Sequence, residues 1–382
     1  MSSPEVPSAA AGGASKGPSA GVSKLPASGG RPAALSAADA AKLPPPLPFV
    51  PGSWTLVVVP DTQMYAEENP AGLEAQTRWI AAQRAARNVP LVVQVGDLTN
   101  RNWPEQWQRV RAAFRHLDGV VPYSLVTGNH DYGPGGDSQT RDSGLNEFFD
   151  AAEYAKQPTF GGFFEAALQN ERGEPCATAL EQCGVEGSSP ANPRLENNYH
   201  LFTAGARDWL ALSLEWSPRD AVVAWADAVL RQHARRRAIV VTHAYLYSDN
   251  TRYDHIRRPE HFWNPYDYAT AKLPGGTNDG EDLWQKLIAR HEHVDFVLSG
   301  HVLNEGHGRL SSTTPGGHVV HQLMADYQER PLGGEGYLRL MEFLPDGQTV
   351  QVKTYSPVLD RYLTEPGQQF VLKLDAPAAK SG

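Results

Sequence analysis

Residues 91–100 read LVVQVGDLTN, a run of aliphatic residues that ends in glycine and an acidic residue. A short run of this composition is typical of a buried strand, so the polar residues would lie at its carboxyl end. The same pattern occurs on either side in the chain, at WTLVVVPD (54–61) and VPYSLVTGNHD (121–131). Helical patterns separate the three runs, and the sequence therefore predicts parallel βαβ units.

The pattern is interrupted and then resumes. Residues 133–196 are rich in glycine, proline and polar residues, and we interpret them as an insertion in a domain that spans 51–375. Strand patterns return at DWLALSLE (208–215), AIVVTH (238–243) and VDFVLSGH (294–301). Beyond 301 the chain reads as β structure throughout, and we expect antiparallel strands there. The Asp-Gly pair of LPDGQT is a hairpin signal.

Composition excludes some classes of protein. The 34 basic and 43 acidic residues give a net charge of -9, which argues against a protein that mainly coats nucleic acid. No stretch approaches the roughly 18 apolar residues of a membrane span. The first fifty residues are mostly alanine, glycine, serine and proline, so we expect 1–50 to be disordered and 376–382 to be a flexible tail.

Two features bear on localisation. Cys176 and Cys183 lie close together in a glycine-rich stretch, where they form either a small disulfide or two free thiols. The first fifty residues lack the apolar core of a signal peptide. They are either a flexible cytoplasmic tail or the tether of an exported protein, periplasmic, secreted or surface-attached. We favour a disulfide and export.

Polar residues follow five of the predicted strands. In open parallel sheets, ligands bind beyond the carboxyl ends of the strands, so these five ends would converge on one cleft. Each alone is an ordinary turn or cap, but their joint occurrence predicts a site. Carboxylates, an amide oxygen and imidazoles together make a mixed oxygen and nitrogen site for divalent metals. The five ends are Asp61-Thr62-Gln63, Gly96-Asp97, Gly128-Asn129-His130-Asp131, Thr242-His243 and Gly300-His301.

This ordered set of motifs resembles the calcineurin-like metallophosphoesterase superfamily over residues 54–357. The resemblance implies an α/β fold, a four-layer α-β-β-α sandwich of two mixed β-sheets flanked by helices. It also implies two divalent metal ions (Mn, Mg, Fe, Ca or Zn) and hydrolysis of a phosphodiester or a small phosphomonoester. The alternative is a non-catalytic, metal-stabilised surface or scaffold protein on the same fold. The oligomeric state stays open.

The resemblance also implies roles for individual residues. Asp97 would bridge the two metals, and Asp61 would bind the first. The second would be bound by Asn129, His243 and His301. His130 would face the scissile phosphate and protonate the leaving group, while Asp131 would orient His130.

Two departures from the family pattern concern the first metal. Asp61-Thr62-Gln63 stands for D-x-H, and Gly300-His301-Val302-Leu303 stands for GHxH. Gln63 can offer an amide oxygen, and Asn304, Glu305 or His307 are candidates to replace the histidine expected at Leu303. Such an oxygen-rich site favours Mg²⁺, Mn²⁺, Ca²⁺ or ferrous iron over Zn²⁺. The alternative is a protein that holds the second metal only.

Loops beyond the strand ends are expected to select the substrate. Arg101 or Arg252 could pair with a phosphate oxygen. Ordinary loop packing is the alternative for each candidate. The candidates are Asn100, Arg101, Tyr132, Tyr245 and Arg252.

Overall fold

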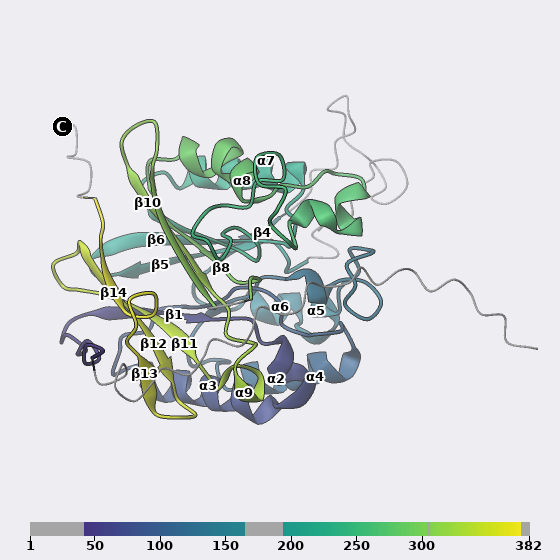
Figure 1. The fold of residues 1–382 in the computed structure, drawn as a ribbon. Coiled ribbons are helices and arrows are strands. Elements are labelled where there is room, and N and C mark those ends of the chain that lie inside the picture. Colours follow the sequence, from purple (N-terminus) through teal and green to yellow (C-terminus); the bar gives the residue numbers. More distant parts are fainter. Residues whose placement is uncertain (1–41, 165–193, 304–305, 376–382) are drawn as a thin grey trace, which may run out of the picture. The chain divides into compact units, whose positions relative to one another are not determined.

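The structure is a computed structural model that describes residues 42–164, 194–303 and 306–375. Two seven-stranded sheets lie face to face, with α2, α3 and α4 on the outside of one and α7 and α8 on the outside of the other (Figure 1). The expected four-layer α-β-β-α sandwich is confirmed. The tail at 376–382, Cys176 and Cys183 lie outside the described residues, as do residues 1–41 of the segment expected to be disordered. Residues 42–50 of that segment are described, and there the expectation is wrong, because the backbone nitrogens of Leu47 and Val50 donate to the side chains of Gln369 and Glu342.

The first sheet has the strand order β13-β12-β11-β1-β2-β3, and β14 also pairs with β12. Neighbours from β1 to β3 are parallel, whereas those from β1 to β13 and β14 are antiparallel. Its strands are β1 (Trp54–Val59), β2 (Val92–Gln94), β3 (Tyr123–Ser124), β11 (Leu338–Phe343), β12 (Thr349–Ser356), β13 (Arg361–Leu363) and β14 (Phe370–Lys373).

The second sheet has the order β4-β5-β6-β7-β8-β10-β9. Its four central strands, from β6 to β10, run parallel to one another. The expectation of antiparallel strands beyond residue 301 holds for β9 and β10, which pair antiparallel, but is wrong for the pair of β10 and β8, which is parallel. Its strands are β4 (Phe160–Phe163), β5 (Asn198–Ala204), β6 (Arg207–Leu214), β7 (Arg237–Thr242), β8 (Val294–Ser299), β9 (His307–Thr313) and β10 (Val319–Ala325).

The helices connect the strands and cover the sheets. The described part of the 133–196 insertion forms α5, α6 and β4, which extends the second sheet. The α-helices are α2 (Gln63–Glu68), α3 (Pro70–Gln83), α4 (Pro104–Phe114), α5 (Leu145–Phe148), α6 (Ala151–Tyr154), α7 (Asp220–Gln232), α8 (Gly280–Lys286) and α9 (Pro331–Gly334). The 3₁₀ turns are η1 (Asn129–Asp131), η2 (Pro265–Asp267), η3 (Ala269–Lys272) and η4 (Ile288–Arg290).

Three apolar cores hold the four layers together, because strand side chains alternate between faces. Val57 and Val59 of β1 pack with the helices that cover the first sheet. Val58 lies instead in the core between the sheets, together with Val241 of β7. Val240 of β7 belongs to the third core, under α7 and α8. Both sheets are thus buried on two faces, which explains their near-continuous apolar runs.

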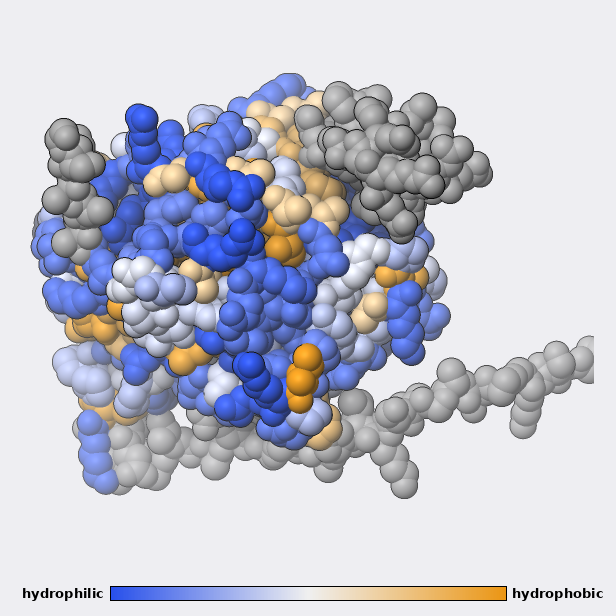
Figure 2. Space-filling model, turned by 90° about the horizontal axis from the view of Figure 1, so that it is seen from above, coloured by the Kyte–Doolittle hydropathy of each residue, from blue (hydrophilic) through white to orange (hydrophobic). Residues whose placement is uncertain are grey.

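The face seen from above, over α7 and α8, is mainly hydrophilic and carries apolar side chains in limited areas (Figure 2). No helix within the described ranges combines the length and the apolar character needed to cross a membrane.

Candidate metal centre

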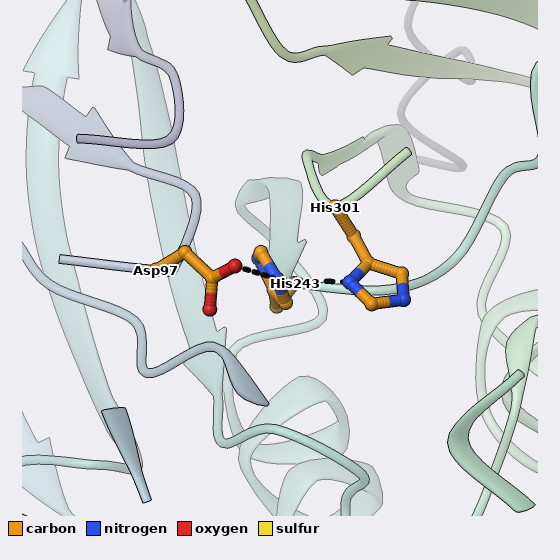
Figure 3. Close-up of side chains that lie close together, drawn as sticks. All are labelled: Asp97, His243 and His301. Carbon is orange, nitrogen blue, oxygen red and sulfur yellow. Dashed lines mark hydrogen bonds and ion pairs between the residues drawn. The ribbon is translucent and has the colours of Figure 1, made fainter. Parts of the chain in front are cut away.

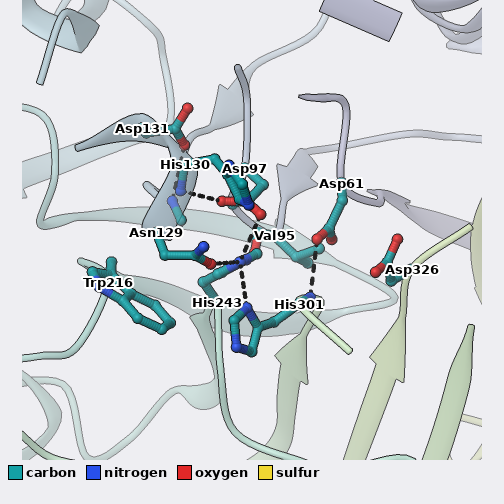
Figure 4. Close-up of polar contacts among 12 residues, drawn as sticks. Asp61, Val95, Asp97, Asn129, His130, Asp131, Trp216, His243, His301 and Asp326 are labelled. Atoms are coloured by element: carbon teal, nitrogen blue, oxygen red, sulfur yellow. Dashed lines mark hydrogen bonds and ion pairs between the residues drawn. The ribbon is translucent and has the colours of Figure 1, made fainter. Parts of the chain in front are cut away.

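Six strand ends meet at one edge of the two sheets. They bring together Asp61, Asp97, Asn129, His243 and His301, as expected, and also Asp326, which directly follows β10 (Figure 4). Gln63 begins α2, two residues after Asp61. All seven side chains are between 0% and 6% exposed. The centre is therefore a buried polar cluster built from both sheets.

One half of the centre contains nitrogen. Nε2 of His243 lies 3.2 Å from Nδ1 of His301 and 3.3 Å from Oδ2 of Asp97 (Figure 3). It also lies 3.2 Å from Oδ1 of Asn129. The other ring nitrogens lie 2.8 Å from backbone carbonyls, Nδ1 of His243 from Val95 and Nε2 of His301 from Trp263. Because a carbonyl only accepts, these two nitrogens donate, and the facing pair is left with lone pairs when the rings are neutral. Asn129, His243 and His301 are called the nitrogen half below.

Charge and burial set the protonation of this half. Burial and the neighbouring His243 lower the pKa of His301 to about 3, so this ring is neutral. Burial acts to raise the pKa of Asp97, but the charges on His243 and His130 hold it at about 2. Burial acts to lower the pKa of His243, but the neighbouring Asp97 carboxylate outweighs burial, so this pKa is raised. A divalent cation would displace that remaining proton.

The other half offers only oxygen atoms. Oδ2 of Asp61 accepts a hydrogen bond from the backbone of His301 at 3.0 Å, whereas Oδ1 of Asp61 and Oε1 of Gln63 are buried without a partner. The Asp326 oxygens accept from the backbone and side-chain nitrogens of Gln328, at 3.0 and 3.2 Å. Asp61, Gln63 and Asp326 are called the oxygen half below.

The buried carboxyl groups of the oxygen half have raised pKa values because nothing in the described part of the chain compensates their negative charge. Among the described residues, no lysine or arginine forms an ion pair with Asp61, Asp97 or Asp326. Asp97 pairs instead with the imidazole of His243. Burial, Asp326 and Asp97 together raise the pKa of Asp61. Burial raises the pKa of Asp326 to about 7. Buried charges are normally paired or bound to metal, so this arrangement fits a cation.

The motif glycines make room for these side chains. A Cβ at Gly96 would overlap the His243 ring, and one at Gly300 would overlap Oδ1 of Asp61. A Cβ at Gly128 would overlap the Asp97 carboxylate. Each glycine of a motif thus clears space for a polar side chain from another strand. Asp97 and His301 themselves have φ angles of 50° and 77°, a strained conformation that clusters at functional sites.

His130 lies beside this cluster. Its backbone nitrogen donates to Oδ1 of Asp97 at 2.9 Å, and its Nδ1 lies 2.9 Å from the carbonyl of Asn100. In the described part of the chain no partner is recorded for its Nε2. The side chain is half-buried, so Nε2 is available to a ligand.

Asp131 differs from expectation. Its carboxylate accepts backbone hydrogen bonds from Leu98, Thr99 and Gly128 at 2.8 to 2.9 Å, and does not bond to the His130 ring. The carbonyl of Asn100 fixes that ring instead. Asp131 therefore joins the two loops that follow β2 and β3, and acts on His130 only through the backbone.

The expected substrate residues do not gather in one place. The side chains of Asn100 and Arg101 both bond to Glu67, and Arg101 remains about half exposed at 47%. Tyr132 and Tyr245 are each 1% exposed within the core under α7 and α8. Arg252 pairs with Glu281 at 2.6 Å and stacks on Trp284. These contacts of Tyr132, Tyr245 and Arg252 stabilise the fold.

The position after His301 is only partly described. Asn304 and Glu305 lie outside the described residues, so those two candidates stay predictions. Leu303 is half-buried. The ring of His307 packs tightly against Gly367, in the loop between β13 and β14. It is therefore directed at that loop.

Sequence reasoning missed Asp326 and Trp216. Asp326 follows an apolar strand just as Asp61 does, and that signal was available, but it was attached to a strand expected to be antiparallel. The Trp216 ring packs on His243 and His301, with ring centroids 5.7 and 5.1 Å apart. No local signal marks Trp216, since its position depends on how the sheets pack.

Comparison with known proteins gives one family match. Residues 55–305 match the family described as calcineurin-like phosphoesterase. Protein YvnB of Bacillus subtilis (strain 168), described as uncharacterised, is 28% identical over 323 residues, which are 81% of this chain and 20% of YvnB. The chain thus spans about a fifth of that relative.

Three solved structures are similar at low identity. A dimetal phosphatase from Danio rerio is 14% identical with a TM-score of 0.46, over 84% of this chain and 99% of the other. GAP50 of Plasmodium, described as the anchor in the inner membrane complex, is 10% identical with a TM-score of 0.42 over 85% and 90%. The NAD nucleotidase of Haemophilus influenzae is 12% identical with a TM-score of 0.38 over 84% and 50%.

Proposed function

The chain belongs to the calcineurin-like phosphoesterase family, and on that premise we propose that it is a metal-dependent hydrolase of phosphoesters. One observation carries the proposal. Asn129, Asp97 and His301 direct polar atoms to within 3.3 Å of Nε2 of His243, in a buried site whose far side holds orphaned carboxylate and amide oxygens. This donor set fits divalent cations.

The residues would divide between two ions. The nitrogen half would hold one and the oxygen half the other, and Asp97 would be available to both. Divalent ions held there would polarise a phosphate and make water acidic enough to attack it near neutral pH. The carbonyls of Val95 and Trp263 keep the two imidazoles in the orientation that this binding requires.

His130 supplies the proton for the leaving group. Its Nδ1 is held by the carbonyl of Asn100, so Nε2 carries the transferable proton when the ring is charged. The backbone bond to Asp97 places the ring next to the shared carboxylate. Asp131 keeps the two loops in register and so maintains this position.

We further propose a small substrate, either a phosphodiester or a phosphomonoester. Arg101 is the one expected substrate residue that combines a positive charge with substantial exposure, and it lies on the loop that carries Asp97. Export remains a separate prediction, which cell fractionation of the natural host would check.

Hydrolysis tests the proposal directly. The protein is stripped with EDTA, dialysed, and assayed with Mn²⁺ against nitrophenyl phosphate and bis-nitrophenyl phosphate. We expect turnover that depends on the metal and is lost in His243→Ala. His116→Ala, a substitution at a surface histidine, serves as the matched control and should keep full activity. Tight metal binding without turnover of either ester would reject the proposal in favour of the non-catalytic alternative.

A further inference from the structure

We propose that Asp326 is a ligand of the first metal, where it takes the place of the histidines that the family pattern leads one to expect. The oxygen half then forms, with Asp97, an all-oxygen site for a hard divalent cation such as Mg²⁺ or Mn²⁺. This inference rests on the proposed function only for the presence of metal at the centre.

Topology places Asp326 at the centre. β10 pairs in parallel with β8, with Met324 opposite Ser299, so both strands end at the same edge of the second sheet. His301 follows the end of β8 by one residue, and Asp326 directly follows β10. Figure 4 shows the Asp326 carboxylate next to that of Asp61, on the side of the cluster away from Asn129.

Hydrogen bonds fix the Asp326 side chain without neutralising it. Its backbone nitrogen donates to the carbonyl of Gly306 at 3.0 Å, and Gln328 donates one bond to each carboxylate oxygen. Each oxygen retains a further lone pair. Such outer bonds orient a metal-binding carboxylate and are themselves part of a metal site.

Two further atoms point to a ligand independently of charge. Oδ1 of Asp61 and Oε1 of Gln63 are buried acceptors without a donor, and their residues are 2% and 5% exposed. Leaving a buried acceptor unsatisfied is costly, so such an atom is normally satisfied by a bound water or ion. A divalent cation held between Asp61 and Asp326, whose charges act on each other, would satisfy Oδ1 of Asp61, and Gln63 is the candidate to add its amide oxygen.

The donor set predicts metal preference. Carboxylate and amide oxygens favour Mg²⁺, Mn²⁺ and Ca²⁺, whereas sites with imidazole suit Zn²⁺ and Fe²⁺. The two halves should therefore differ, with a hard ion bound by oxygen beside an ion bound partly by nitrogen. A histidine at Leu303 would have made them alike.

Metal binding to Asp326→Asn tests the proposal. Protein stripped with EDTA is titrated with Mn²⁺ and followed by calorimetry, elemental analysis and electron paramagnetic resonance. The wild type should bind two Mn²⁺ ions with an exchange-coupled spectrum. The variant should keep one ion with an isolated-ion spectrum, and its affinity at the lost site should fall by at least about 100-fold, the upper range for outer-sphere changes.

The matched control is Glu329→Gln, which removes another negative charge that acts on Asp326. It should keep both ions and the coupled spectrum, which separates direct ligation from a general field effect. A thermal melt in EDTA verifies that Asp326→Asn is folded, and Gln63→Ala gives a second route to weaken the same ion. Two ions bound by Asp326→Asn with unchanged affinity, or a single ion in the wild type, would overturn the proposal. Two ions in the wild type without ester hydrolysis would overturn the proposed function alone.

Discussion

The nitrogen half and the oxygen half of the centre are both buried, yet they differ in how their atoms are satisfied. In the nitrogen half, each imidazole is hydrogen-bonded on its outer side, and Nε2 of His243 lies 3.2 Å from both Oδ1 of Asn129 and Nδ1 of His301. In the oxygen half, Oδ1 of Asp61 and Oε1 of Gln63 are orphaned, and within the described ranges no lysine or arginine pairs with Asp61 or Asp326. The first half is preorganised by hydrogen bonds, whereas the second would be completed by the cation that we propose.

The difference indicates where the family pattern tolerates change. The His243 and His301 rings pack against Trp216 and donate to fixed carbonyls, so replacing either ring would disturb several contacts at once. In the oxygen half, Oδ1 of Asp61 occupies space that Gly300 leaves open, and Gln328 holds the Asp326 carboxylate. We infer that an oxygen ligand can reach this half from a different strand, so that the carboxylate after β10 stands in for a histidine in the loop after β8.

Asp97→Asn should have the largest effect, because Asp97 is the residue that both halves share. Asparagine adopts the left-handed conformation found at this position, so the fold should persist. We expect kcat/KM to fall by about 10³-fold or more, with loss of both ions by elemental analysis. Asp118→Asn, at a partly exposed carboxylate paired with Arg111, is the control and should change neither.

His130→Ala should come next, and should separate chemistry from metal binding. We expect kcat to fall by about 10²- to 10⁴-fold for a poor leaving group, because the proton donor is lost. The loss should shrink for nitrophenolate, which leaves without a proton. Metal content should stay at the wild-type level. An equal loss for good and poor leaving groups would contradict a role as general acid.

The folding stability of the metal-free protein should depend on pH through the Asp326 carboxyl. The folded pKa of Asp326 is raised to about 7 from 3.8, so between these values the folded state binds more protons than the unfolded state. This carboxyl therefore lowers stability as pH rises through that window. Asp326→Asn removes the effect, so its melting temperature should exceed that of the wild type more at pH 8 than at pH 5. Added Mn²⁺ should make the wild type melt at a higher temperature than the variant at pH 8. An equal difference in melting temperature at pH 5 and pH 8 without metal would contradict the raised pKa of Asp326.

Arg101→Ala should have the smallest effect. Arg101 is held by Glu67 on an exposed loop, and exposed pairs contribute roughly 0.2–1 kcal/mol. We expect stability to change within that range and KM to rise by less than about tenfold, with kcat unchanged, since a single exposed contact affects substrate binding uniformly. A large fall in kcat would place Arg101 among the residues that act on the reacting phosphate.

Much of the centre followed from local sequence. Asp61, Asp97, Asn129, His243 and His301 each stand directly or within two residues after an apolar run, and parallel strands bring such positions to one edge. The glycines beside three of them were recognisable as motif members, although only the structure showed whose side chain each one clears. Asp326 also follows an apolar run, but it was missed. Its strand, β10, lies after the β9–β10 turn and was expected to be antiparallel, whereas it pairs in parallel with β8.

The sequence by itself determined the alternation of strands and helices and the chemistry available at the strand ends, because burial period and residue type are local properties. Only the tertiary structure decided which ends meet. It placed Asp326 beside Asp61, and it showed that the carbonyl of Asn100, and not Asp131, accepts the hydrogen bond from the His130 ring. Strand order and backbone hydrogen bonds depend on residues far apart in the chain, and no local pattern encodes them.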